Sequence, residues 1–401
     1  MGCLPSFVRL ITVALIACLI NACASKPDQQ FKARELAPEP EFSQEPLADE
    51  DLAIAAIQPA DAFLLSVGVV TFEDDASHRD RGDVDAQVLA EINQNEAKYI
   101  PYLLRNTLTA SNQWGVVRVL PETDPSVDLN LYGKILKSTG LELVLQIRAV
   151  DSTGRVWLDK IYRDLASLEH YPEAHHFSAW NRFDPQSFID PFQNTYHQIA
   201  NDLLEARTQL GEKVSEEVQQ VSRLVYAQDL SPSAFVGTLT TNSDGLKQPA
   251  RLLARDDPAL QRVEEIHARH EIFIDSVDEY YQALFEEMQP LYVVWRRYSY
   301  DEVVAEQQDL EQLSATSNAN HRDNYASLVD RYDRYKWSKI YQQEFTELAT
   351  GFNNEIAPAV LELNRRVYGL TGSMDNQYRQ WRDILRQMYE LETGLPPLPP
   401  K

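Results

Sequence analysis

Hydrophobic positions between residues 61 and 208 change from the spacing of strands to that of helices and back. Phe63 to Phe72 is a short apolar run, typical of a buried strand. Val88 to Asn112 has apolar residues three and four positions apart, which predicts a helix with a kink or restart at Pro101. A second short strand is expected at Val116–Leu120. The pattern predicts an α/β module over residues 61–208.

Three later segments of this module are strand candidates: 129–135 and 141–148, which alternate apolar and polar residues, and 155–163. The segments between them, Lys137–Gly140 and Asp151–Gly154, have turn composition and end in glycine. Short turns join antiparallel strands, so the three segments predict an antiparallel β-meander.

The rest of the chain is predicted to be helical. A helix follows Asp190-Pro191 and is expected to run on through Val214 to Leu224. Residues 209–257 thus form a connecting helix and loop, and an apolar helical stripe begins at Asp257-Pro258 and ends at Pro290. Further helices are expected over 300–314, 322–356, 359–368 and 374–392. The fold class is therefore α+β: a small α/β module with an antiparallel β-meander, then an all-α helical bundle at 258–392 and a Pro-rich tail at 393–401.

The first residues follow the order of a secretory signal peptide over 1–22, with Arg9 before an apolar run from Leu10 to Ile20. Ile20-Asn21-Ala22-Cys23 resembles the lipobox of bacterial outer-membrane lipoproteins. The resemblance implies a lipid-modified, palmitate-bearing Cys23 and attachment to the periplasmic face of the outer membrane. Residues 23–60 then form a lipidated flexible tether, because they are polar and rich in proline.

Two other lipidation patterns are present. Leu15-Ile16-Ala17-Cys18 is a rival lipobox, and Gly2 with Cys3 fits eukaryotic myristoylation and palmitoylation. We favour Cys23 because the rival lipobox leaves a short apolar segment, and the loose myristoylation pattern carries less information than an ordered signal peptide.

Charge and composition exclude several functions. A net charge of -24 argues against binding to nucleic acid, which needs a surplus of Lys and Arg. The closest glycines, Gly369 and Gly372, have the wrong spacing for a dinucleotide fingerprint, a P-loop or a nucleophile elbow. We therefore assign no catalytic residue and expect no cofactor.

The run from Leu143 to Trp157 contains the turn Asp151-Ser152-Thr153-Gly154. This run, within residues 61–208, resembles a module of the curli-secretion lipoproteins, the N-terminal domain of the Tol-system propeller protein and the lipoprotein activators of penicillin-binding proteins. That family implies assembly and partner binding rather than chemistry. The segment 166–189 and the helical region after the module depart from it.

Two groups of residues are candidate sites. The first group consists of histidines whose imidazole groups could bind a metal ion: His170, His175, His176 and His197. Aromatic side chains that could contact a protein or stack on a sugar are concentrated in the last third of the chain, at Trp295, Trp337, Trp381, Tyr332 and Tyr335. Chance clustering in a polar loop is the simpler interpretation of the histidines, and helix packing is that of the aromatic residues. A third group, His267, His270 and Glu271, is interpreted as a solvated helix face.

The sequence predicts a non-enzymatic scaffold or assembly factor that binds an envelope protein or further copies of itself, and the membrane through its lipid. Two alternatives stay open. A glycan-binding regulator of cell-wall synthesis would expose the tryptophans, whereas a metal-dependent enzyme would use the His170–His197 loop.

Overall fold

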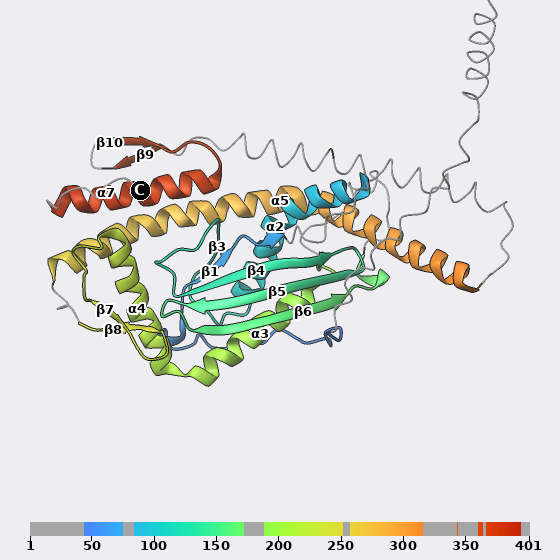
Figure 1. Ribbon diagram of the computed structural model, residues 1–401, viewed down its shortest axis with the longest axis horizontal. Helices are drawn as coiled ribbons and strands as arrows, with labels where there is room; N and C mark the ends of the chain where they lie inside the picture. Colours follow the sequence, from blue (N-terminus) through green and yellow to red (C-terminus); the bar gives the residue numbers. More distant parts are fainter. Residues whose placement is uncertain are drawn as a thin grey trace, which may run out of the picture. The chain divides into compact units, whose positions relative to one another are not determined.

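The computed structural model describes residues 44–74, 84–171, 188–251, 257–315, 343, 360–363 and 366–393. Their fold is mixed α+β, as predicted. The main sheet contains β1 (Val67–Val70), β2 (Glu73–Asp74), β3 (Val117–Leu120), β4 (Leu129–Ser138), β5 (Glu142–Asp151) and β6 (Val156–Leu165). Its order is β3-β1-β4-β5-β6, with β2 beside β4 (Figure 1). β1 is parallel to β3 and β4, whereas β4, β5 and β6 pair antiparallel in chain order.

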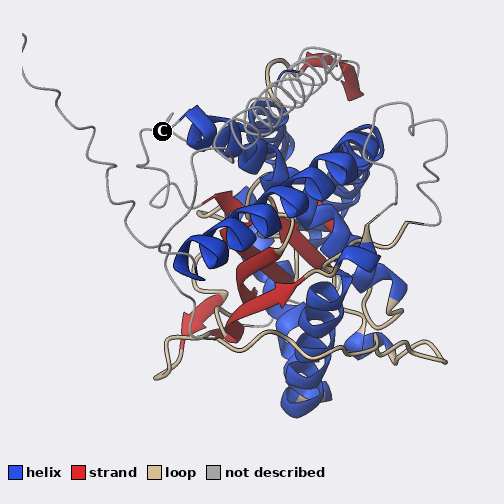
Figure 2. Cartoon of the chain, turned by 90° about the vertical axis from the view of Figure 1, so that its right-hand side faces the viewer, coloured by secondary structure: helices blue, strands red, loops and turns tan. Residues whose placement is uncertain are grey.

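Helices line one face of this sheet and one of its edges (Figure 2). The helices are η2 (Asp61–Phe63), α2 (Val84–Ala110), η4 (Leu168–His170), α3 (Gln193–Leu210), α4 (Glu212–Leu230), α5 (Pro258–Ala315) and α7 (Met374–Thr393). α2 contacts β1, β3 and β4, and α3 contacts both α2 and β6, so α2 and α3 share a face. On the opposite face β5 and β6 carry polar residues such as Gln146, Arg148 and Asp159, since successive strand residues alternate between faces.

The β3 edge of the sheet is covered by α5. Asp278 of α5 accepts a hydrogen bond from the backbone N–H of Val119, with the two atoms 2.8 Å apart. Arg118 of β3 forms ion pairs with Asp275 (2.7 Å) and Glu271 (2.6 Å) of α5. An exposed edge strand would leave its N–H groups unpaired, so these bonds both cover this edge and place α5 on it.

The turn between β5 and β6 explains the motif that carries the family resemblance. Asp151 Oδ1 accepts hydrogen bonds from the backbone N–H groups of Thr153 (2.9 Å) and Arg155 (3.0 Å), and Oδ2 accepts one from Nε1 of Trp157 (2.8 Å). Gly154 has φ 93°, a conformation that favours glycine. Each motif residue named here stabilises the hairpin, so within the described residues the motif is structural.

The turn between β4 and β5 is a second point where α5 meets the sheet. The backbone N–H of Gly140 donates to Oγ of Ser299 over 3.0 Å. A Cβ at position 140 would clash with the backbone of Arg296 and Tyr300. Glycine therefore lets the helix backbone approach this turn closely.

A buried charge cluster joins α5 to α2 and to the same turn. Arg296 is 2% exposed, and its Nε donates to the hydroxyl of Tyr292 over 2.6 Å. Its Nη2 lies 3.4 Å from Oε1 of Glu96, a fully buried residue of α2, and its Nη1 donates to the carbonyl of Thr139. The hydrogen bonds to Tyr292 and Thr139 and the ion pair with Glu96 compensate the desolvation of the guanidinium.

Asp190 adds a second carboxyl to this cluster and is expected to make stability depend on pH. Burial raises its pKa to about 6, and the positive charge of Arg296 only partly opposes this effect. A carboxyl whose pKa is raised in the folded state destabilises the fold as pH rises from about 4 through about 6. Between pH 4 and pH 7 this effect lowers the free energy of unfolding by about 3 kcal/mol, and we expect Asp190→Asn to abolish that decrease, as measured by urea unfolding at the two pH values. Asp159→Asn, which changes an exposed carboxyl, is the control and should show the same decrease in the free energy of unfolding as the wild type. An unchanged pH profile in Asp190→Asn would contradict the assignment.

Residues 44–55, which we define as the strap, lie against β6 and α3 instead of belonging to a free tether. Strap N–H groups donate to the carbonyl of Arg163 (2.8 Å) and to the side-chain oxygens of Asn194 and Asn201 (2.9 Å each). Nε2 of Gln198 donates to a strap carbonyl over 2.9 Å. These bonds involve the strap's backbone, so its side chains did not predict them, and Leu47 and Leu52 of the strap also pack against the core.

Three helix boundaries differ from the sequence expectation. α5 continues through Pro290, because the buried residues Leu291, Tyr292 and Trp295 pack after it and outweigh the missing hydrogen bond. The helix expected at 359–368 is replaced by antiparallel strands β9 (Val360–Leu363) and β10 (Arg366–Gly369). α3 does not continue into α4, because Gly211 has φ 78°. A small hairpin, β7 (Leu239–Thr241) and β8 (Lys247–Pro249), follows α4.

The described part of the chain shares one hydrophobic core from β1 through α5 to α7. α7 lies beside α5 in Figure 1 and contacts it. The boundary predicted at 209–257 therefore does not separate two cores here. The helix predicted at 322–356 and the tail lie outside the described residues. Within those residues, no helix has the length and apolar character that a membrane crossing requires.

Candidate functional site

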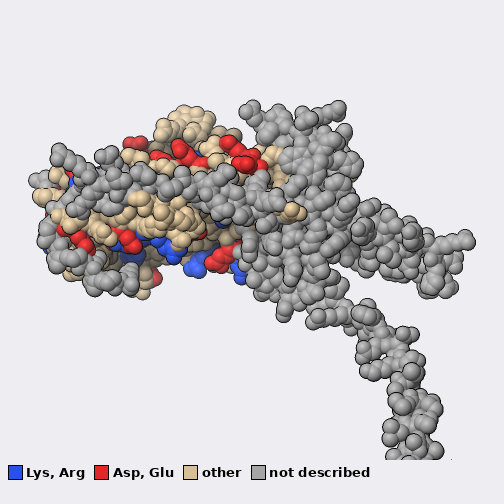
Figure 3. Space-filling model, turned by 90° about the horizontal axis from the view of Figure 1, so that it is seen from above, with Lys and Arg blue, Asp and Glu red and all other residues tan. Residues whose placement is uncertain are grey.

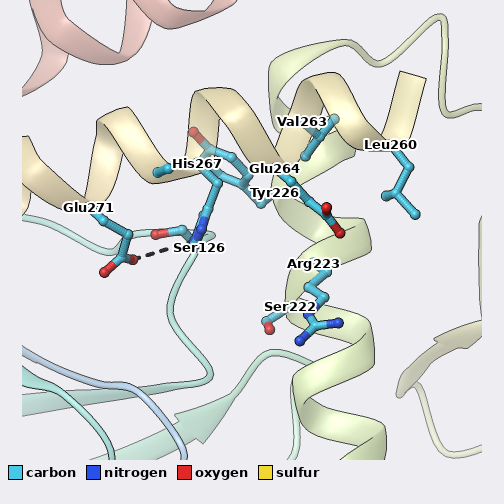
Figure 4. A pocket seen from close by; sticks show the side chains of 10 residues that line it. Ser126, Ser222, Arg223, Tyr226, Leu260, Val263, Glu264, His267 and Glu271 are labelled. Carbon is cyan, nitrogen blue, oxygen red and sulfur yellow. Dashed lines mark ion pairs between the residues drawn. The ribbon is translucent and has the colours of Figure 1, made fainter. Parts of the chain in front are cut away.

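A pocket of about 480 Å³ lies between α4, the first turns of α5 and the loop after β3 (Figure 4). Its walls are formed by Ser126, Ser222, Arg223, Tyr226, Leu260, Val263, Glu264, His267, Ala268 and Glu271. The apolar stripe of α5 faces the core here, and the residues beside that stripe on the helix line the pocket. The pocket therefore combines aliphatic, aromatic and charged groups from three segments distant in sequence.

The buried carboxylate of Asp124 adjoins this pocket and connects three elements. Its Oδ2 lies 2.8 Å from Nε2 of His270 on α5 and accepts a hydrogen bond from the hydroxyl of Tyr378 on α7. Its Oδ1 accepts bonds from the N–H (2.7 Å) and the hydroxyl (2.5 Å) of Ser126. Burial alone would raise the pKa of Asp124, but the charge of His270 and these hydrogen bonds hold that pKa well below its usual range.

A second buried carboxylate, Asp128, binds the other pocket serine. Oγ of Ser222 on α4 donates to Oδ1 of Asp128 over 2.5 Å, and the N–H and hydroxyl of Ser66 donate to Oδ2 over 2.9 Å each. Burial raises the pKa of Asp128, and the hydrogen bonds only partly oppose it. These bonds tie α4 to the start of β4.

The hydrogen bonds of the two serines determine what the pocket can do chemically. A serine nucleophile donates its hydroxyl proton to a base, usually a histidine. Ser126 and Ser222 donate instead to aspartates, while Nε2 of His270 faces Asp124 and Nε2 of His267 lies 3.4 Å from Oε1 of Glu271. Desolvation by burial lowers the pKa of His267. This arrangement is suited to binding rather than to nucleophilic catalysis.

The described tryptophans among the predicted binding residues lie in the core. Trp295 is 2% exposed and Trp381 is 1% exposed. Their rings therefore present no face on which a sugar could stack. Trp337, Tyr332 and Tyr335 lie outside the described residues, as does the predicted lipidation site Cys23.

The histidines of the predicted metal site have separate roles where they are described. Nδ1 of the exposed His170 pairs with the N–H of Ser167 at 3.4 Å. Nδ1 of His197, on α3, lies 3.1 Å from the carbonyl of Glu50 in the strap. His175 and His176 lie outside the described residues. Across the portion of the chain that the structure describes, no group of three metal-ligating side chains comes together.

His270 is the site residue that the sequence interpretation misplaced. A solvated helix face was expected, but His270 is only 1% exposed. It lies three or four positions from the buried Ile266, Phe273 and Ile274, so the helical stripe itself contained the signal. Its partner Asp124 lies in a loop with no periodic pattern, and nothing in the sequence marked it.

Comparison with known proteins identifies no family. No protein family matches this chain, and no curated protein matches it. Among solved structures, a PelC dodecamer variant from Paraburkholderia phytofirmans is similar at 16% identity, over 38% of this chain and 96% of that one, with a TM-score of 0.21. A similarity this weak supports no conclusion about function.

Proposed function

We propose that this protein is a lipid-anchored, non-enzymatic scaffold or assembly factor at the periplasmic face of a bacterial outer membrane. In this proposal Cys23 carries the lipid, and the α/β module with its antiparallel meander binds an envelope protein or a further copy of the chain. The helical C-terminal part, proposed to form a bundle, supplies a second contact surface.

The observation that carries the non-enzymatic assignment is the bonding of the pocket serines. Both hydroxyls donate to buried aspartates, so neither donates to a histidine of the kind that usually activates a serine nucleophile. The glycan-binding alternative depended on exposed tryptophans, and Trp295 and Trp381 are buried. The metal-enzyme alternative depended on convergent histidines, and the described His170 and His197 bond to different segments.

The polar outer face of the meander is the surface we assign to a protein partner. Arg148 and Asp159 lie opposite each other on β5 and β6, with Nε and Oδ2 4.0 Å apart, and both side chains are about half exposed. Basic and acidic side chains also lie beside each other on the described part of the surface in Figure 3. Mixed charge of this kind suits a protein partner better than nucleic acid, which needs a basic surface.

Replacing the predicted lipidation site is expected to release the protein from the membrane. After fractionation of cells, the wild type should sediment with the outer membrane, and Cys23→Ser should be absent from that fraction, because no acyl chain is attached. Cys18→Ser is the matched control and should behave as the wild type. A Cys23→Ser protein that still sediments with the outer membrane would contradict the proposed anchor.

The same cells allow a test of the scaffold role. A photo-crosslinking amino acid at position 148 should give a discrete adduct with an envelope protein or a second copy, and one at the exposed position 216 of α4 should not. Absence of any adduct at 148 in the anchored protein would count against partner binding by this face.

A further inference from the structure

Two exposed side chains of opposite charge line the pocket, and the charge of one of them, Arg223, also acts on the buried Asp128. Arg223 extends from α4 and Glu264 from the facing α5, and both side chains line the pocket (Figure 4). Both residues are exposed. Across the described residues, neither side chain makes a hydrogen bond or an ion pair. A ligand entering the pocket therefore meets one available cation and one available anion.

The other charged groups around the pocket are already paired. Oε2 of Glu271 lies 2.6 Å from Nη2 of Arg118, and Oε1 lies 3.4 Å from Nε2 of His267. The lowered pKa of His267 favours its neutral form. Arg223 and Glu264 thus dominate the charge that a ligand experiences.

Apolar side chains also line the pocket beside these two charges. The ring of Tyr226 is buried, stacks on His270 with 5.7 Å between ring centroids, and meets His267 edge-on at 5.0 Å. Leu260 and Val263 complete this side of the pocket. An aliphatic or aromatic group of a ligand would bury apolar surface against these side chains.

These features select one ligand class. A phosphate dianion would be repelled by Glu264, and a divalent cation would be repelled by Arg223. A molecule with a carboxylate and an ammonium group satisfies both, because arginine binds a carboxylate through two parallel hydrogen bonds and glutamate accepts hydrogen bonds from an ammonium. A volume of about 480 Å³ can hold a molecule of dipeptide size.

We propose that the pocket between α4 and α5 binds a small zwitterion, a free amino acid or short peptide with an apolar side chain. Arg223 binds its carboxylate, Glu264 binds its ammonium group, and Tyr226 contacts its side chain. This binding site is independent of the membrane anchor and of the partner surface on the meander.

Calorimetric titration of the purified full chain with leucyl-alanine tests the proposal. The free dipeptide should bind, and its N-acetyl and C-amide forms should each bind at least about tenfold more weakly, since each lacks one charged contact. Arg223→Gln should weaken binding of the free dipeptide by a similar factor and leave the affinity of the C-amide form unchanged. Glu264→Gln should also weaken binding of the free dipeptide, but it should leave the affinity of the N-acetyl form unchanged.

Controls separate this site from general charge effects. Glu216→Gln, on an exposed part of α4, should bind the free dipeptide as the wild type does. Absence of binding at millimolar dipeptide, or equal affinity for capped and free forms in the wild type, would overturn the proposal. Binding of inorganic phosphate or magnesium in place of the dipeptide would overturn it too. The capped peptides need no variant, so the test does not depend on the variants folding.

Discussion

Arg296→Met is expected to lower the free energy of unfolding by about 3–5 kcal/mol, because it removes one partner of a buried charge cluster and takes the positive charge of Arg296 away from Glu96. In the wild type the guanidinium bonds to Tyr292 and Thr139 and lies beside Glu96. Methionine fills a similar volume but can replace none of these polar contacts. Urea unfolding of the purified chain, followed by tryptophan fluorescence, measures the change.

Two further variants test whether the lost cation is the cause. Arg148→Met removes an arginine whose side chain is 55% exposed and should change the free energy of unfolding by less than about 0.5 kcal/mol. Adding Glu96→Gln to Arg296→Met should restore part of the stability, because it removes the buried carboxylate that faced Arg296. If Arg296→Met were no less stable than Arg148→Met, the cluster would contribute nothing to the fold.

Asp124→Ala is also expected to destabilise the fold by about 3–5 kcal/mol, and its effect should be greatest on α7. The substitution leaves the buried His270 and Tyr378 without the acceptor that joins α5 to α7. Since the pKa of Asp124 is below its usual range, its stabilisation is complete above about pH 4 and is lost as pH falls toward its folded-state pKa. Amide hydrogen exchange along α7, together with urea unfolding at pH 7, measures both effects.

A surface aspartate provides the matched control for this prediction. Asp229 also binds α7, through Arg382 (3.2 Å) and Arg386 (2.9 Å), but its side chain is 27% exposed. Solvent screens these ion pairs more than the fully buried bonds of Asp124, so Asp229→Ala should cost less stability than Asp124→Ala. Equal effects of the two substitutions on α7 exchange would contradict a special role for the buried carboxylate.

The sequence predicted elements wherever a periodic pattern and turn residues agreed. Val67–Val70 is a fully buried strand, and its apolar run was visible directly. Helix α7 begins and ends within a residue of the predicted 374–392. At Pro290 local propensity failed, because the packing of the following turn is a tertiary effect that the residue itself does not reveal.

The candidate site was much less predictable. The pocket joins α4 to α5 and to a loop after β3, and such contacts arise from packing between segments far apart in sequence. His270 could have been found from its place in the helical stripe, whereas Asp124 could not. Trp381, expected to be a binding residue, is buried against Phe273 with 5.1 Å between ring centroids. Aromatic content by itself does not distinguish a surface platform from core packing.

The bonded strap limits how far the folded part can stand from a membrane. If Cys23 carries the lipid, only residues 24–43 separate it from the first strap residue bonded to the sheet, Gln44. Even fully stretched, this segment covers at most about 70 Å, roughly half of what a free chain to residue 60 would cover. Under the proposed anchoring, the strap bonds to Asn194 and Asn201 would therefore set the greatest distance between the module and the membrane.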